Sequence, residues 1–205
     1  MQYSTELCQL IIRNMAIVEE APKVHGEVEN YLFATINKRI EASVAKKEGW
    51  RGCYELAPDD DDVTQTSFSP TTWPDEGSLA GYWLSPKEGE NLSWLSCALG
   101  VQGASLCLEF AVYKDLGGVS KKDNKTRCQK FYTNTPALHE AGFLYEEDTK
   151  HIDLGFALYL PFTLNAEALA AEFPDIDKAL APLDEALEKL FSVHKHFDAF
   201  VKELS

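Results

Sequence analysis

Apolar residues recur every three or four positions at the start of the chain, which predicts two helices. The first covers 5–19, ends near Pro22 and carries an apolar stripe of Leu7, Leu10, Ile11, Met15 and Val18. The second covers 26–47 and repeats every fourth residue through Val28, Leu32, Ile36, Ile40 and Val44. Charged residues between the apolar positions indicate that each helix has one solvated face.

From Trp50 onward the apolar runs become short and are separated by turn residues, which predicts an antiparallel sheet with meander topology. Its five to six strands are expected at 52–57, 79–85, 92–99, 104–113, 142–146 and 151–160. In 104–113 and 151–160 every second residue is a large apolar one, so one face of these strands is expected to pack on the core. Tyr82 and Trp83 must then point to opposite faces of the sheet.

The C-terminal part of the chain is helical again. A short helix is expected over 163–174 with Thr163 as its cap, and a longer one carries the stripe Ile176, Leu180, Leu183, Leu187, Leu190, Phe191, Phe197 and Val201. Pro182 is expected to kink or restart this helix. The sequence therefore predicts a single α+β domain over 1–205, helical over 1–49, mainly β over 50–162 and helical over 163–205. The N-terminal and C-terminal helices are expected to pack on one face of the sheet.

The formal net charge of −14 changes which partners are expected. A field of that sign repels phosphate backbones and anionic lipids and attracts basic proteins, so we expect no direct nucleic-acid ligand and no membrane contact. Residues 114–130 are the exception, with six basic residues against two acidic ones, and we expect them to form a mobile loop. The N-terminus lacks the features of a secretory signal, which predicts a cytoplasmic protein, and we expect a bacterial source.

The chemistry-bearing residues are sparse. Five cysteines, Cys8, Cys53, Cys97, Cys107 and Cys128, are widely spaced without a CxxC pair, which favours free thiols over disulfides or zinc. The sequence has no GxSxG serine and no glycine-rich phosphate loop. We therefore expect no cofactor and no metal, and a binding protein rather than an enzyme.

The run Asp59–Asp62 is the most concentrated charge in the chain. Calcium loops space their carboxylates at alternate positions around a glycine, which this run does not do. It lies near Trp73 within the segment 51–113, which contains ten acidic residues and only two basic ones. Carboxylates beside aromatic rings are typical of interfaces for cationic partners. We therefore predict an acidic binding surface made of Asp59, Asp60, Asp61, Asp62, Trp73, Asp75, Glu76, Glu88 and Glu90.

An immunity protein or inhibitor that neutralises a basic, nuclease-like toxin fits this surface. The first alternative is a metal-dependent hydrolase or nuclease that uses Glu109, His151 and Asp153 on the second face of the sheet. The second is a self-associating regulatory protein whose acidic and basic segments pair between subunits. His194 and Asp198 lie one helical turn apart, and we interpret His194 as a core histidine.

Overall fold

The structure is a computed structural model that describes residues 4–58, 65–74, 80–87, 92–113, 121–146 and 154–204. It confirms an α+β fold with helices at both ends of the chain around an antiparallel sheet. None of the helices in these ranges is both long and apolar enough to cross a membrane.

The sheet has six strands in the order β1-β2-β3-β4-β6-β5, and each neighbouring pair is antiparallel. Its strands are β1 (Trp50–Tyr54), β2 (Thr66–Pro70), β3 (Ala80–Lys87), β4 (Ser105–Tyr113), β5 (Leu144–Glu146) and β6 (Leu154–Phe162). The order follows the chain up to β4, as a meander does. Then β6 inserts between β4 and β5, because the two nine-residue strands form the long central pair and the three-residue β5 is left at the edge.

Two expectations about strands were wrong. Residues 92–99 form the helix α3 (Trp94–Ala98), followed by the short η1 (Val101–Gly103), and not a strand. The physical reason is Ser93, which has an extended backbone and whose hydroxyl accepts a hydrogen bond from the Ser96 N–H at 3.1 Å, as a helix N-cap does. The strand β2 was not predicted, because Phe68 is the only large apolar residue among Thr66, Phe68 and Pro70, which face the core, so the sequence shows no apolar alternation there.

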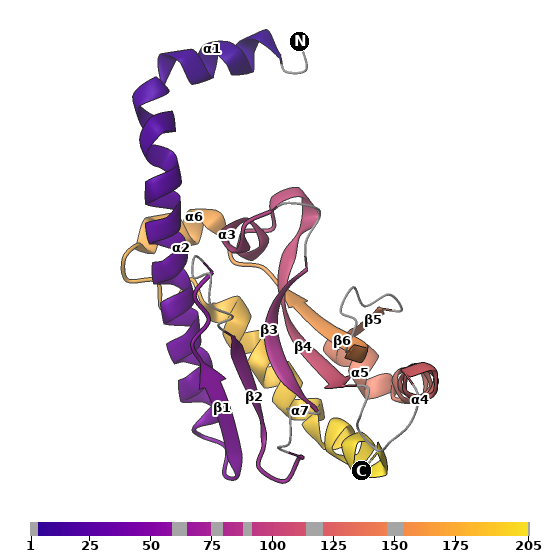
Figure 1. Cartoon of the computed structure of the whole chain (residues 1–205). Helices are drawn as coiled ribbons and strands as arrows, with labels where there is room; N and C mark the ends of the chain where they lie inside the picture. The colour runs from indigo at the N-terminus through magenta and orange to yellow at the C-terminus, as the bar shows by residue number, and fades with distance from the viewer. Residues whose placement is uncertain are drawn as a thin grey trace.

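The N-terminal helices are divided differently from the prediction. Helix α1 (Thr5–Arg13) ends at Asn14, whose side-chain Nδ2 donates to the Leu10 carbonyl at 2.8 Å, and α2 (Met15–Val44) continues through Pro22. Figure 1 shows α1 turned away from the axis of α2, with the first half of α2 extending beyond the sheet.

The basic segment was predicted as a loop, but its described part is the helix α4 (Lys121–Asn134), which is followed by α5 (Pro136–Ala141). The buried Cys128 and the ring of Phe131, stacked on Phe200 at 4.3 Å, fix α4 against the rest of the protein. Apolar contacts at one-turn spacing thus give this polar segment a helical conformation.

The C-terminal helices are α6 (Ala166–Glu172), capped by Asn165 rather than by Thr163, and α7 (Ala181–Leu204). Pro182 is the second residue of α7, a position that proline tolerates. The prediction that a helix restarts at Pro182 is therefore confirmed, and a kink at this residue is not observed. Helix α7 crosses one face of the sheet, and Arg39 of α2 joins it through an ion pair of 2.9 Å with Asp184.

The alternation predicted for the central strands is confirmed, but their second face is also closed. Leu106, Leu108 and Phe110 of β4 point into the main core. On the other face Ala111 and Ala157 are buried beneath Trp83 and Tyr159. Large rings lying over small neighbours therefore seal the part of this face that no described helix covers.

Phe110 is fully buried where β3, β4 and α7 meet. Replacing it with alanine leaves a cavity, and we expect Phe110→Ala to lower the free energy of unfolding by about 3–5 kcal/mol. Urea unfolding followed by circular dichroism measures this. The matched control is Val101→Ala, at a side chain that is 40% exposed, for which we expect a change within about 0.5 kcal/mol. Equal effects of the two variants would contradict the described core.

Candidate functional site

The strand register decides how the predicted acidic residues are grouped. β1 ends at Tyr54, opposite Thr66, so the connection from β1 to β2 leaves the same end of the sheet as the C-terminal end of β3 at Lys87. Asp59–Asp62 belong to the first connection, and Glu88 and Glu90 to the connection that follows Lys87. These six residues lie outside the described ranges, but the described strand ends before and after them belong to one end of the sheet, here called the acidic end.

Both described flanks of the first acidic connection are attached to α2. Nδ2 of Asn37 donates to the Leu56 carbonyl at 2.9 Å, and the Thr66 hydroxyl donates to Oδ1 of the same side chain. Asn37 is 7% exposed and Thr66 is fully buried. One buried amide thus fixes the points at which this connection leaves and re-enters the sheet.

The described flanks of Asp75 and Glu76 lie at a different end of the sheet. The two acidic residues themselves lie outside the described residues, in the connection from β2 to β3, whose flanks are Pro74 and Ala80. Ala80 pairs with Val112, near the end of β4 that is opposite to Ser105. The described flanks of the predicted surface therefore lie at two opposite ends of the sheet, one for the connections with six of the acidic residues and one for the connection with the other two.

Trp73 was predicted to lie at the binding surface, but the structure places it in the core. Its side chain is 2% exposed, its ring lies 5.5 Å from Tyr82, and its Nε1 donates to Asp198 at 3.1 Å. The segment after β2 turns the indole toward α7, because a large ring and a hydrogen-bond partner are both available there. The ring is therefore not exposed to contact a partner, and we correct that prediction.

His194 lies inside the same aromatic cluster, in agreement with its interpretation as a core histidine. Its Nδ1 and the Tyr82 hydroxyl are joined by a hydrogen bond of 2.9 Å, and Trp50 packs on its ring at 4.6 Å. Burial lowers the pKa of His194 to about 4, against a smaller opposing effect of Asp198. Burial also raises the pKa of Tyr82 well above its ordinary value, so both partners are neutral at pH 7.

Asp198 stays charged beside this neutral pair. Its hydrogen bond from Lys202, at 2.7 Å, is the first cause of a lowered pKa, and the indole of Trp73 adds to the effect. The i,i+4 spacing of Asp198 and Lys202 on α7 places the ion pair at the rim of the aromatic cluster. The arrangement orients Trp73, and it gives His194 a structural role instead of a role in proton transfer.

The second face of the sheet carries Glu109, the described member of the alternative catalytic cluster. Glu109 pairs with Trp83 on one side and with Tyr159 on the other, and it is 6% exposed. His151 and Asp153 lie outside the described residues. The first residue of β6, Leu154, pairs with Tyr113, which is four residues or about 14 Å along β4 from Glu109. The register offers this cluster no support, and it stays a prediction.

The region around Glu109 is arranged for packing and ion pairing. Lys87 lies over the Tyr159 ring at 4.1 Å and forms a salt bridge with Glu146. Within the described ranges, no group of three or more His, Cys, Asp or Glu residues is placed to hold a metal ion. The indole of Trp83 covers Gly81, where a Cβ atom would lie 2.8 Å from the ring, so this glycine is needed for the close approach.

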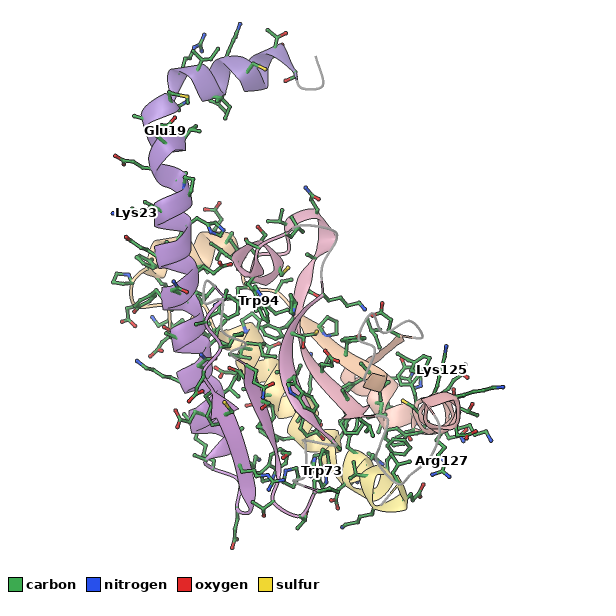
Figure 2. The ribbon with its side chains drawn as sticks, in the orientation of Figure 1. Glu19, Lys23, Trp73, Trp94, Lys125 and Arg127 are labelled. Carbon is green, nitrogen blue, oxygen red and sulfur yellow. The ribbon has the colours of Figure 1, made fainter. Side chains whose placement is uncertain are left out.

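Exposed basic side chains lie on α4, away from the acidic end. Lys122, Arg127 and Lys130 are exposed. Figure 2 shows Lys125 and Arg127 projecting from α4 on the side of the molecule opposite to α1. A pocket of about 500 Å³ lies beside the contact between this helix and the end of α7 and is lined by Arg127, Lys130, Phe131, Phe200 and Glu203, among others. The exposed basic residues of α4 therefore lie apart from the described strand ends that define the acidic end.

The N-terminal helices were not assigned to binding by the sequence analysis, yet they contain many exposed apolar side chains. We call residues 5–24 the arm. The predicted stripe implied that one face would pack on the protein, but Ile12 and Ile17 lie outside that stripe and are 73% and 66% exposed. Apolar residues on several sides of an amphipathic helix were the signal that could have identified it.

The lowered pKa of His194 makes stability depend on pH. Unfolded chains take up a proton near pH 6.5 and the folded protein only near pH 4, so stability falls as the pH drops through this window. The loss amounts to at most about 3 kcal/mol. We expect His194→Asn, which keeps a hydrogen-bonding partner for Tyr82, to flatten this slope in urea unfolding at a series of pH values. His196→Asn is the control and keeps the slope; a slope unchanged in His194→Asn would contradict the assignment.

Comparisons with known proteins identify no relative of this chain. No protein-family model matches the sequence, and searches of curated proteins and of solved structures return no match. The segregated charges, the buried aromatic cluster and the exposed arm are the features from which a function can be inferred.

Proposed function

We propose that this protein is an acidic protein-binding module that engages a basic protein partner. The observation that supports it best is the register of β1, β2 and β3, in which the described flanks of the connections containing Asp59–Asp62, Glu88 and Glu90 lie at one end of the sheet. The two connections contain six carboxylates, and Lys87 at the end of β3 is the only lysine or arginine between Asp59 and Glu90 in the sequence.

Charge of one sign at one end of a protein acts at long range. It accelerates encounter with a basic surface and disfavours acidic competitors, while it contributes less to the final affinity than buried contacts do. The exposed bases of α4 lie elsewhere on the molecule, and at physiological salt exposed charges more than about 8 Å apart are largely screened from each other. They therefore do not neutralise the field at the acidic end.

The partner class that fits is a protein that itself binds nucleic acid. Such a protein must present lysine and arginine to the phosphate backbone, and an acidic module can occupy the same surface. A bacterial immunity protein or inhibitor directed against a nuclease-like toxin has this role. The described flanks of the first acidic connection, held by Asn37, support such a role because fixing the two ends of a connection lowers the conformational entropy that is lost on binding.

Neutralising the aspartate run tests the proposal. We expect the variant with Asp59, Asp60, Asp61 and Asp62 all changed to Asn to bind its basic partner about 10- to 100-fold more weakly, because several charge pairs are lost together. The partner is first isolated by affinity capture from the source organism with the wild-type protein. Its affinity and association rate are then measured by biolayer interferometry at low and high salt.

The matched control changes four exposed carboxylates on the helices, Glu140, Glu167, Glu185 and Glu188, to Gln. It alters the net charge by the same amount, so we expect only a small loss of association rate. A partner that binds both variants equally well, or whose binding is insensitive to salt, would contradict the proposal.

A further inference from the structure

The arm is unusual in the number of apolar side chains that it exposes. Ten large hydrophobic residues are exposed in the described ranges, and six of them lie within the twenty residues of the arm. These six are Leu10, Ile11, Ile12, Met15, Ile17 and Val24, and they range from 41% to 73% exposed. Contiguous exposed apolar surface of this kind marks an interaction site in a folded protein.

The arm is held in place by the body of the protein. Just beyond its last residue, Nε2 of His25 lies 3.1 Å from the Ser93 hydroxyl, and the Glu29 carboxylate accepts a hydrogen bond of 2.6 Å from the Leu95 N–H. Glu29 is 4% exposed. From this point α2 is packed on the protein, while Figure 1 shows the residues before it extending clear of the sheet and the other helices.

We propose that the arm binds the arm of a second copy of this chain in an antiparallel pair, with α1 of each copy against residues 15–24 of the other. The bend between α1 and α2 suits this arrangement, because a two-fold axis can place each α1 alongside the partner's α2. Within 15–28 the apolar residues Ile17, Ala21, Val24 and Val28 alternate at spacings of four and three, as on the contact face of paired helices.

The order of charges favours a second copy in the antiparallel direction. α1 carries Glu6 near its start and Arg13 at its end. The facing segment, taken in the reverse direction, carries Lys23 first and then Glu20 and Glu19. Antiparallel packing thus sets opposite charges against each other, whereas parallel packing would set Glu6 against the glutamates and Arg13 against Lys23.

The arm also has the charge and the apolar surface that self-association requires. It contains three acidic and two basic residues, whereas the whole chain has a net charge of −14. Two copies can therefore meet at nearly neutral arms while their acidic bodies stay apart. The six exposed large apolar side chains of the arm supply the apolar centre that such an interface needs. Anionic membrane surfaces are a poorer match, because they would repel the acidic body.

Analytical ultracentrifugation of the full chain at micromolar concentration tests the proposal. We expect the wild type to sediment as a dimer and Ile17→Glu to sediment as a monomer with an unchanged circular dichroism spectrum. The matched control, Val101→Glu, places the same new charge at an exposed apolar position of the body and should remain a dimer. Since Ile17 is not part of the connections that contain the acidic residues, Ile17→Glu should still bind the basic partner.

Charge exchange tests the direction of the pair. We expect Arg13→Glu and Glu20→Arg each to raise the dimer dissociation constant about tenfold, and the double variant to restore it, because a new pair of opposite charges forms. Lys38→Glu, on an exposed part of α2 outside the arm, controls for net charge. Failure of the double variant to recover would overturn the antiparallel arrangement. A monomeric wild type would overturn the dimer, whether its arm then binds phosphatidylglycerol vesicles or remains free in solution.

Discussion

The packing of aromatic rings around Tyr82 is the interaction on which the rest of the fold depends. Tyr82 is fully buried at the centre of the sheet, and its ring contacts Trp50, Phe68, Trp73, Phe110, Phe197 and His194. Those neighbours come from β1, β2, β4, α7 and the segment after β2, so one side chain connects three other strands to the C-terminal helix. The hydrogen bond with His194 satisfies the one polar atom of that ring and gives the cluster a single arrangement.

The predictable parts of the fold were those where one physical effect dominates the local sequence. Alternation in 104–113 and the apolar stripe of the last helix each reflect burial of one face, and both were confirmed. The errors arose where tertiary contacts outweigh local preference. Residues 92–99 are apolar enough for a strand, yet one serine hydroxyl begins a helix there, and α4 is helical because Cys128 and Phe131 are buried against other elements. Such contacts join residues far apart in the chain, so a local pattern does not contain them.

The candidate site, too, was predictable where it depends on local sequence and not where it depends on contacts between distant residues. Its charge was evident from composition, but its grouping depends on strand register, which puts the described flanks of Asp75 and Glu76 at the end of the sheet opposite to the flanks of the other six acidic residues. Trp73 is adjacent in sequence to these residues and was interpreted as an interface ring, whereas the core uses it. Two different forces thus operate on two surfaces: long-range electrostatics at the acidic end, and short-range apolar contact at the arm.

Asn37 acquires a wider significance when these surfaces are considered together. It lies on the same thirty-residue helix as the second half of the arm, and it holds both flanks of the first acidic connection. A pair of chains joined through their arms would therefore present two acidic ends in a fixed relative orientation, because one continuous helix connects each contact to each loop. Such a particle would be bivalent: it would hold two copies of a basic partner at a set separation, and a partner that is itself dimeric would be bound with avidity.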